Sequence, residues 1–307
     1  MPEGEATLLI GGDGFFGTAI AQALASTGHE VHVLSRHSDS RRQNGISIHQ
    51  GNQNESDVVA PLLDICQTVI HLASTTNPGS SARAPLSEID GNVFPAVQLM
   101  EIMSKHKPKR LIFTSSGGAV YGNPQYLPVK ETQALQPHSY YAAGKAALES
   151  LFTAYAHSND VPLTILRPSN LYGPGQQLRR GFGLVRTLFE KCLKDEPIEI
   201  WGDGHNIRDY LFINDAIEAV TAVLNTPDAV GAFNIGSGDG VSVIDLISLV
   251  QDVTGRELKI LNRAGRRTDV KAIVLDTTKI HTSTGWEART NLSTGLKSTW
   301  DWILEKK

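Results

Sequence analysis

A glycine-rich turn between two apolar segments constrains the fold more than any other feature of this sequence. The pattern reads as a strand, a turn, an alanine-rich helix and a second strand, at residues 8–10, 11–17, 18–26 and 31–34. Glycines at Gly11, Gly14 and Gly17 let the backbone turn tightly and approach a pyrophosphate at the helix N-terminus. Glycines at this spacing also occur in ordinary β-turns, but the flanking strand and helix favour a dinucleotide-binding βαβ unit.

Apolar runs typical of short buried strands continue along the chain and alternate with helical segments. Further strands are predicted at residues 46–49, 68–72, 109–114 and 163–166, and helices at residues 57–65, 90–106 and 140–157. This alternation predicts an α/β fold with a Rossmann-type, doubly wound parallel sheet that is covered on both faces. A dinucleotide would then lie across the carboxyl ends of the strands.

The second half of the chain has a different character, because glycine and proline cluster at residues 173–175. Only short strands are predicted there, at residues 198–201 and 232–235. The expected boundaries are residues 1–168 for a dinucleotide-binding domain and residues 169–307 for a smaller C-terminal α/β substrate-binding lobe. Residues 205–235 are expected to return to the first domain, because residues 212–224 are apolar enough to join its core.

Composition and charge exclude several classes of protein. The 307 residues are 40% hydrophobic and carry a net charge of −4 without a long basic run, so neither nucleic acid nor an anionic membrane is an expected partner. No apolar run approaches the ~20 residues that span a bilayer, and the acidic start does not resemble a signal peptide. Cys66 and Cys192 are expected to be reduced core residues of a cytoplasmic protein. The histidines, including His138 and His205, lack partners at metal-ligand spacing, so no metal site is expected.

A tyrosine and a lysine four residues apart form the strongest candidate for a catalytic pair. On a helix, Tyr141 and Lys145 would project from the same face, one turn apart. A nearby ammonium favours the phenolate form of a tyrosine, and so does the positive charge of a nicotinamide ring. Tyr141 is therefore predicted to act as a general base near neutral pH. The spacing alone also arises by chance, so its meaning depends on the surrounding motifs.

The end of the second strand bears on which dinucleotide binds. Many such sites place an acidic residue there to hydrogen-bond the adenosine ribose, whereas an arginine accommodates a 2′-phosphate. This chain has Ser35 followed by Arg36, and an arginine at this position favours NADP. The alternative interpretations are that the Arg36 side chain stacks on the adenine or that it faces solvent. Asn52 and Gln53, after the strand at residues 46–49, are predicted to lie near the adenine and to read its edge.

Taken together, the motifs resemble the extended branch of the short-chain dehydrogenase/reductase superfamily, in the NAD-dependent epimerase/dehydratase family. The resemblance extends from Gly11 to Trp302, and the motifs occur in the family's order. They are the glycine turn, His71-Leu72-Ala73, Asp90-Gly91-Asn92-Val93, residues 114–122, Tyr141 with Lys145, residues 167–175, Gly202-Asp203-Gly204, Arg208-Asp209-Tyr210, Asn214-Asp215 and residues 233–238. Any one of them is explained by a turn or a core strand, but the ordered set is not.

The resemblance implies a reaction and a set of cofactor contacts. Tyr141, assisted by Lys145, would take a proton from a sugar hydroxyl while a hydride moves to the nicotinamide, and Lys145 would also hydrogen-bond the nicotinamide ribose. In a 4-epimerase the 4-keto sugar turns over and regains the hydride on its other face. The cofactor, by resemblance NAD, is then unchanged after a cycle and stays tightly bound. The predicted cofactor residues are Gly11, Gly14, Phe15, Phe16, Gly17, Ser35, Arg36, Asn52, Gln53, Leu72, Ala73, Ser74, Asn92, Thr114, Ser115, Tyr141, Lys145 and Pro168.

The predicted active-site strand departs from the family's pattern at one position, and two further positions disfavour the dehydratase branch of the family. The serine or threonine that normally hydrogen-bonds the substrate hydroxyl falls at Gly117, so that Ser116, Ser115 or a water would have to replace it. We take Ser116 as the third catalytic candidate. Dehydratases of the family usually carry an Asp-Glu pair directly after the active-site threonine, because eliminating water needs a further acid and base. Gly118 and Ala119 stand here, which disfavours dehydration.

Binding a nucleotide diphosphate requires cations, and an arginine guanidinium gives bidentate contacts to a pyrophosphate. Arg208 matches the family position best and Arg267 comes second. The alternative interpretation of each arginine is a solvated charge on the protein surface. Asp269 would then lie near the nucleoside ribose and Asn170 near a phosphate oxygen. Gly117 completes the predicted substrate-binding residues.

The leading hypothesis is a nucleotide-sugar 4-epimerase that acts on a UDP-sugar, with the sugar and the nucleotide left open. A reductase or epimerase/reductase that consumes NADPH is the alternative among enzymes, and Ser35 with Arg36 would suit it. A non-catalytic dinucleotide-binding protein is the alternative of another class, to which Gly117 lends weight. The resemblance also implies a homodimer built from the helices at residues 90–106 and 140–157, although their apolar faces could equally be core.

Overall fold

The computed structural model describes residues 5–178, 183–265 and 270–306, which fall into two units. Unit 1 comprises Met1–Ser115, Tyr140–Arg167 and Val220–Phe233, and unit 2 comprises Ser116–Ser139, Pro168–Ala219 and Asn234–Lys307. The chain therefore passes between the two units several times. No helix in the described part of the chain is both long and apolar enough to cross a membrane.

Unit 1 is built on an eight-stranded sheet with the strand order β11-β7-β6-β5-β1-β2-β4-β3. The strands are β1 (Ala6–Ile10), β2 (Val31–Ser35), β3 (Arg41–Gln43), β4 (Ile46–Gln50), β5 (Cys66–His71), β6 (Arg110–Thr114), β7 (Leu163–Pro168) and β11 (Gly231–Ile235). Neighbours from β7 through β4 pair in parallel, whereas β3 forms an antiparallel hairpin with β4. The chain reverses its direction of travel across the sheet between β1 and β5, the kind of point where α/β sheets bind ligands. The predicted α/β fold with a mostly parallel central sheet is confirmed.

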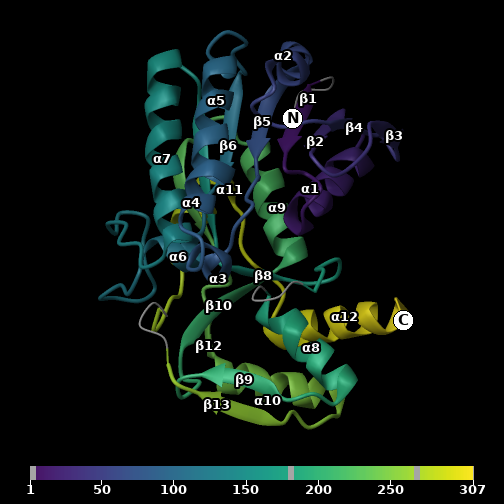
Figure 1. Cartoon of the computed structure of the whole chain (residues 1–307), viewed down its shortest axis with the longest axis vertical. Coiled ribbons are helices and arrows are strands. Elements are labelled where there is room, and N and C mark those ends of the chain that lie inside the picture. The colour runs from purple at the N-terminus through teal and green to yellow at the C-terminus, as the bar shows by residue number, and fades with distance from the viewer. Residues whose placement is uncertain (1–4, 179–182, 266–269, 307) are drawn as a thin grey trace. The chain divides into compact units, whose positions relative to one another are not determined.

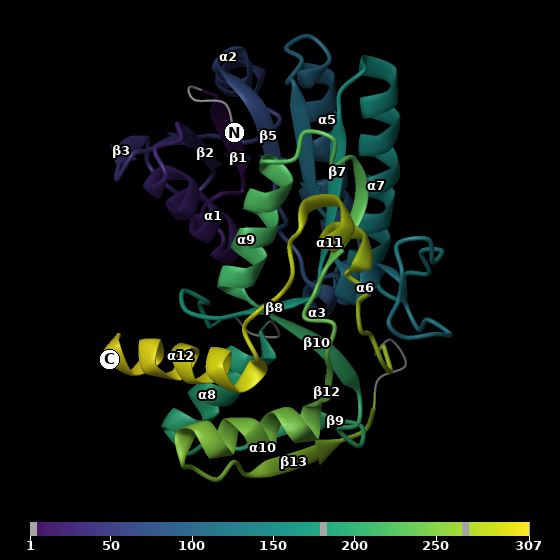
Figure 2. The ribbon, with the colours of Figure 1, turned by 180° about the vertical axis from the view of Figure 1, so that it is seen from behind.

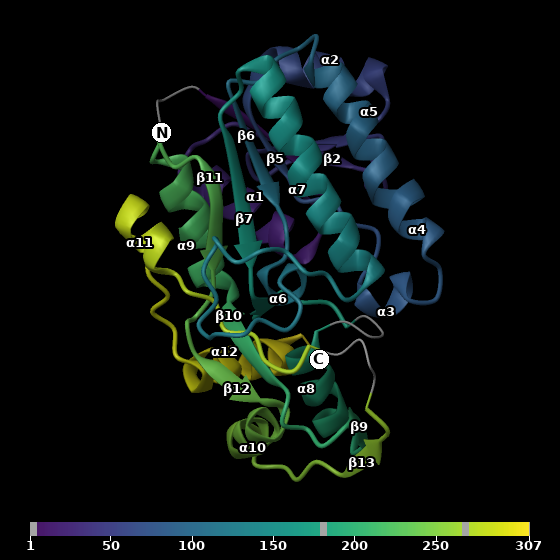
Figure 3. The same cartoon turned by 90° about the vertical axis from the view of Figure 1, so that its left-hand side faces the viewer.

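Helices cover the central strands of this sheet, so that β1, β2, β5, β6 and β7 are buried almost throughout, whereas β3 and β4 at one edge are not. The helices of unit 1 are α1 (Phe15–Ser26), α2 (Ser56–Ile65), α3 (Pro78–Ser81), α4 (Leu86–Glu88), α5 (Phe94–Met103) and α7 (Tyr140–Asn159). Alternate strand residues point to the same face, and on one face Leu8, Val69 and Phe113 join a buried cluster with side chains of α2, α5 and α7. Helices α5 and α7 lie side by side (Figures 1 and 3). Helix α1 packs instead beside β2 and β4.

The helix predicted over residues 90–106 begins in an unexpected way. A π-helical turn, η1 (Ile89–Val93), precedes α5, and Phe94 donates its N–H to the Ile89 carbonyl five residues earlier. Pro95 explains the wide turn, because proline has no N–H and its ring crowds the carbonyl four residues before it. The helical segment predicted near residues 90–106 is therefore observed as a π-helical turn followed by an α-helix.

Unit 2 contains a three-stranded sheet with the order β12-β10-β8 and a two-stranded sheet of β13 and β9. Its strands are β8 (Asn170–Tyr172), β9 (Ile198–Trp201), β10 (Ile207–Phe212), β12 (Gly240–Ser242) and β13 (Ile260–Arg263). Its helices are α6 (Gly117–Val120), α8 (Leu184–Lys194), α10 (Val243–Thr254), α11 (Thr278–Thr284) and α12 (Leu292–Glu305), and α9 (Ile213–Leu224) begins in unit 2 and ends in unit 1. Helix α10 packs against both α8 and α12 (Figure 2).

Candidate active site

The glycine turn packs so closely that side chains would not fit at two of its predicted positions. Gly11 has a φ of +79°, and a Cβ added there would lie 2.6 Å from the Ala73 Cα. A Cβ added at Gly17 would lie 2.6 Å from the Gly12 Cα. Both distances are shorter than real Cβ contacts, so the turn needs glycine at these positions to lie against the end of β5 and to join α1.

Gly14 requires a different explanation. Its φ of −74° suits any residue, and an added Cβ would meet the Gly11 carbonyl oxygen at an ordinary distance of 3.5 Å. Gly14 is the N-cap of α1, so the helix begins at Phe15 and not at residue 18 as predicted, and no side chain caps it there. The first N–H groups of α1, including those of Phe15 and Phe16, can therefore bind an anion. Glycine at position 14 lets that anion approach the backbone.

The end of β2 carries an interaction that the sequence analysis missed. Ser35 is 2% exposed, and its hydroxyl donates to Oδ2 of Asp13 at 2.7 Å. Oγ of Ser35 in turn accepts the N–H groups of His37 and Ser38, each at 3.2 Å. Arg36 is exposed. A carboxylate from the glycine turn thus stands beside the serine that replaces the usual acid, while the preference for NADP stays a prediction.

The two residues expected near the adenine are bonded within unit 1. The amide oxygen of Gln53 accepts from Nε2 of His71 at 2.6 Å, and both side chains are buried. Burial, with the positive charge of Lys145 as a smaller cause, lowers the pKa of His71 to about 3, so the ring is neutral. Asn52 bonds to Glu55 through its backbone N–H and its side-chain amide. Their contacts to adenine stay a prediction.

The other predicted cofactor residues follow β5 and β6 or end β7. Leu72 donates its backbone N–H to the Ile10 carbonyl at 2.9 Å, which brings the chain after β5 beside the glycine turn. Ser74 is exposed, and Pro168 is buried at the end of β7. The Thr114 hydroxyl is buried and has no hydrogen-bond partner among the described residues. A cofactor that accepted from this hydroxyl would satisfy it.

Lys145 is one of the charged residues that unit 1 buries almost completely. The side chain is 4% exposed, Nζ donates to the Thr114 carbonyl at 2.8 Å, and it lies 5.0 Å from the centre of the Phe113 ring. Burial lowers the pKa of Lys145 to about 8, and the negative charges of Glu88 and Glu149 oppose this fall. The ammonium therefore stays mainly protonated at neutral pH.

Tyr141 lies one turn before Lys145, at the beginning of α7. Its side chain is half-buried, and its backbone N–H donates to the hydroxyl of Ser81 at 3.1 Å. Ser81 is fully buried in α3 and thus satisfies an N–H of the first turn of α7. The structure brings the predicted pair together on one helix, and it fixes the start of that helix through a serine that the sequence analysis did not single out.

Glu149 connects Lys145 to the ends of two strands. It is 5% exposed and forms an ion pair with Arg167 at the end of β7, where Nη2 and Oε2 lie 2.6 Å apart. It also accepts the hydroxyl of Ser115, which follows β6. Because the single proton of Ser115 is donated to Glu149, this serine is a poor replacement for the hydroxyl missing at Gly117.

Glu88 is a second buried carboxylate beside α7, and no motif pointed to it. A Cβ added at Gly144 would collide with Oε1, Cδ and Cγ of Glu88, so the carboxylate lies directly on the α7 backbone next to Lys145. Glu88 is 3% exposed and accepts from the Thr76 hydroxyl and from Nδ2 of Asn92, the latter at 2.9 Å. The predicted cofactor residue Asn92 therefore belongs to a buried polar network around this carboxylate.

Four of the remaining predicted residues belong to unit 2. Ser116 is the N-cap of α6 and is half-buried, and Gly117 begins this helix. Asn170 donates from Nδ2 to the Asp209 carbonyl at 2.9 Å and thereby links β8 to β10. Arg208 is half-buried on β10, and its Nη1 donates to the Ile207 carbonyl at 2.8 Å. Arg267 and Asp269 lie outside the described residues.

Asp209 has a structural role that its motif did not reveal. Its carboxylate is fully buried and accepts the backbone N–H groups of Ser237 at 2.8 Å and of Leu275 at 3.2 Å. Burial raises its pKa, and these hydrogen bonds oppose the rise. Asp209 thus connects β10 to two distant segments of unit 2. Within the motif Arg208-Asp209-Tyr210, Arg208 is then the candidate for binding a diphosphate.

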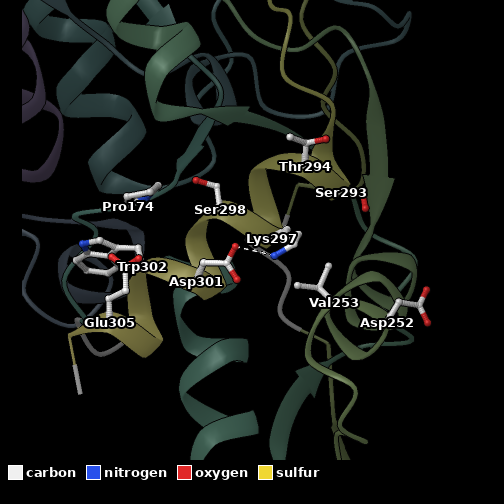
Figure 4. Close-up of a pocket in the computed structure, with 10 residues that line it drawn as sticks. All are labelled: Pro174, Asp252, Val253, Ser293, Thr294, Lys297, Ser298, Asp301, Trp302 and Glu305. Carbon is white, nitrogen blue, oxygen red and sulfur yellow. Dashed lines mark hydrogen bonds and ion pairs between the residues drawn. The ribbon is translucent and has the colours of Figure 1, made fainter.

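A cavity of about 710 Å³ lies between α10, α12 and Pro174 in unit 2 (Figure 4). Its lining includes Asp252 and Glu305, and its cation, Lys297, is paired with Asp301 at 2.7 Å. An excess of carboxylates disfavours a diphosphate. None of the described residues predicted to bind substrate lines this cavity.

Three features together define a short-chain dehydrogenase/reductase of the extended type. They are a mostly parallel doubly wound sheet, a glycine turn after its first strand, and a tyrosine one helical turn before a buried lysine. The model of the NAD dependent epimerase/dehydratase family matches residues 7–236, and the chain belongs to that family. The family predicted from the motifs is confirmed.

Similar proteins extend over the whole chain. A putative UDP-glucose 4-epimerase of Methanocaldococcus jannaschii is 30% identical, over 96% of this chain and 97% of that protein. The structure of a UDP-glucose 4-epimerase of Thermotoga maritima with UDP-glucose has a TM-score of 0.91 at 29% identity and covers 98% of this chain and 99% of its own. The structure of the Thermus thermophilus enzyme with NAD has a TM-score of 0.89 at 28% identity and covers 97% and 99%.

The two kinds of glycine in the turn predict different effects of substitution. Gly17→Ala places a methyl group against the Gly12 backbone and should destabilise the protein by about 1–3 kcal/mol. Gly14→Ala should cost less than about 1 kcal/mol of stability but weaken the binding of NAD about 10-fold to 100-fold, because the methyl group would obstruct the approach of the pyrophosphate. Urea unfolding and titration calorimetry measure the two effects. Equal NAD affinity of Gly14→Ala and wild type would contradict this assignment of Gly14.

The position of Glu88 predicts the titration of Lys145. Glu88→Gln removes the negative charge that opposes the effect of burial, so the pKa of Lys145 should fall below about 8. NMR of protein labelled with ¹³C at lysine Cε measures this pKa, and the signal that disappears in Lys145→Arg identifies the residue. Glu101→Gln, which removes an exposed carboxylate from α5, is the matched control and should leave the pKa unchanged. An equal or higher pKa in Glu88→Gln would refute the electrostatic role.

Proposed function

We propose that this protein is a nucleotide-sugar 4-epimerase that acts on a UDP-sugar and retains a nicotinamide dinucleotide through the reaction. The observation that carries the proposal is the buried ammonium of Lys145 on the same helix as Tyr141, one turn away. A buried cation one helical turn from a phenol has no evident use in packing, since an apolar side chain would avoid the cost of desolvation. It does stabilise a phenolate.

The residues of unit 1 fit the dinucleotide in three respects. The glycine turn and the first N–H groups of α1 form a cradle for a pyrophosphate, and packing does not explain glycine at position 14. The buried hydroxyl of Thr114 lies at the carboxyl end of β6, where α/β sheets bind cofactors. A nicotinamide bound there would supply a reversible acceptor for the hydride of the sugar carbon.

In the proposed mechanism, the residues of this chain move a proton and hold the sugar nucleotide. Tyr141 as phenolate accepts the proton of the 4-hydroxyl and returns it after the sugar has turned over. Lys145 stabilises the phenolate. Ser116 is the preferred replacement for the hydroxyl missing at Gly117, because the proton of Ser115 is donated to Glu149. Arg208 and Asn170 are proposed to bind the diphosphate.

Two alternatives remain distinguishable. A reductase that consumes NADPH would use the same tyrosine and lysine, but it would oxidise one cofactor for each sugar reduced, visible as a loss of absorbance at about 340 nm. A non-catalytic dinucleotide-binding protein would not need the buried Lys145.

We also propose that the protein works in the cytoplasm, which its two buried cysteine thiols, Cys66 and Cys192, support.

Replacing the tyrosine tests the proposed reaction. Tyr141→Phe should lower kcat by about 10²-fold to 10⁴-fold, the usual contribution of a general base. The measurement is the interconversion of UDP-glucose and UDP-galactose, and of a panel of other UDP-, GDP- and dTDP-sugars, without added cofactor. The exposed neighbour Tyr140 provides the matched control, since Tyr140→Phe should keep the wild-type rate. Equal rates for wild type and Tyr141→Phe would rule out the epimerase mechanism.

We further propose that the protein is a homodimer with α5 and α7 at its interface. Leu86, Ile89 and Phe94 are 73%, 50% and 58% exposed along α4, η1 and α5, an apolar row that a second copy would cover. Phe94→Glu should therefore convert dimers to monomers, whereas Tyr126→Glu, at a residue 79% exposed in unit 2, should not. Light scattering during size-exclusion chromatography gives the mass. A monomeric wild type would disprove this interface.

A further inference from the structure

The hydrogen bond between Ser35 and Asp13 joins two positions that both face the cofactor in a dinucleotide-binding unit. Ser35 ends β2, where such units place the acid that reads the adenosine ribose, and Asp13 lies in the glycine turn. A serine hydroxyl has one proton, and Ser35 donates it to Oδ2 of Asp13 at 2.7 Å. The Ser35 oxygen, Oγ, accepts the backbone N–H groups of His37 and Ser38. The hydroxyl is thereby oriented toward Asp13.

The consequence is a negative charge at the usual place, supplied by a different part of the chain. Ser35 is buried, whereas Asp13 is exposed, so that the carboxylate can still accept hydrogen bonds from a ligand. A carboxylate accepts the two hydroxyl groups of a ribose, but it repels a 2′-phosphate, which carries up to two negative charges.

We propose that Asp13 is the residue that selects NAD over NADP in this protein. The inference rests on the proposed dinucleotide-binding function and goes beyond it by naming the selecting residue. Asp13 takes over the role of the acid that is missing from the end of β2, and Ser35 is the positioning residue that holds its carboxylate there. The replacement of that acid by serine therefore does not by itself make the site suitable for NADP.

Basic residues near the same strand end work in the opposite direction. Arg36 follows Ser35 directly, and Arg41 and Arg42 lie on β3; all three are exposed. Long exposed side chains lose conformational freedom when they bind a phosphate, and salt screens their charges. The Asp13 carboxylate is already held by a buried partner, so its repulsion of a 2′-phosphate requires no such ordering.

The test measures binding and does not depend on catalysis. The dissociation constants of NAD and NADP are determined by titration calorimetry on wild-type protein freed of cofactor and on Asp13→Asn. Asp13→Asn should bind NAD more weakly and NADP more tightly, so that the preference for NAD falls about 10-fold to 100-fold. Asp39→Asn removes another exposed carboxylate after β2 and should keep the wild-type preference. The double variant Asp13→Asn with Ser35→Asp should regain a preference for NAD, because the acid returns to the strand end.

Each result decides the proposal. Mass measurement of the cofactor released from purified wild type should give NAD. A wild type that binds NADP more tightly, or an Asp13→Asn variant with the wild-type preference, overturns the role of Asp13 while leaving the dinucleotide-binding function intact. A wild type that binds neither dinucleotide overturns the proposed function as well.

Discussion

The chemistry proposed for unit 1 depends on keeping a cation in the protein interior. An ammonium loses most of its hydration when it is buried, and Lys145 is almost completely buried. The Thr114 carbonyl, the face of Phe113 and the charges of Glu88 and Glu149 compensate this loss only in part, since the pKa of Lys145 still lies near 8. The same surroundings increase the effect of the ammonium on a neighbouring phenol, because they screen charges less than water does.

Because of this requirement, Glu149 both connects parts of the fold and supports the charge of the candidate site. Its carboxylate pairs with Arg167 at the end of β7, accepts from Ser115 after β6, and supports the charge of Lys145 one turn away on α7. Removing any one partner would leave a buried charge without full compensation, which is far more costly than losing an exposed pair. The carboxyl edge of the sheet and α7 are therefore held by one network.

The parts of the structure that periodicity controls could be predicted from the sequence. Buried strands, the glycine turn and the spacing of Tyr141 and Lys145 follow from local pattern, and so does the parallel sheet that they imply. Even the π-helical turn at η1, within the helical segment predicted near residues 90–106, has a local cause in Pro95. What fixes the helix geometry there is a missing N–H, a property of the residue itself.

The contacts that the sequence analysis missed have no periodic signature. Glu88 lies on a three-residue helix and Asp13 in a turn, and neither position indicates what lies beside it. Their partners become neighbours only when the sheet brings distant segments together, Gly144 in one case and Ser35 in the other. The same limit applies to Ser115 and Ser116, which are adjacent and chemically identical until the fold gives one of them to Glu149.

A ligand responds to charges where they stand in space, whichever residue supplies them. Reading Ser35 and Arg36 by sequence position alone favours NADP, because the expected acid is absent and a cation follows. The hydrogen bond from Ser35 to Asp13 places a carboxylate at the strand end, so the expected preference changes from NADP to NAD. A substitution at a specificity position can therefore be neutral for specificity when a neighbouring turn supplies the same charge, and the residue substituted becomes the one that orients it.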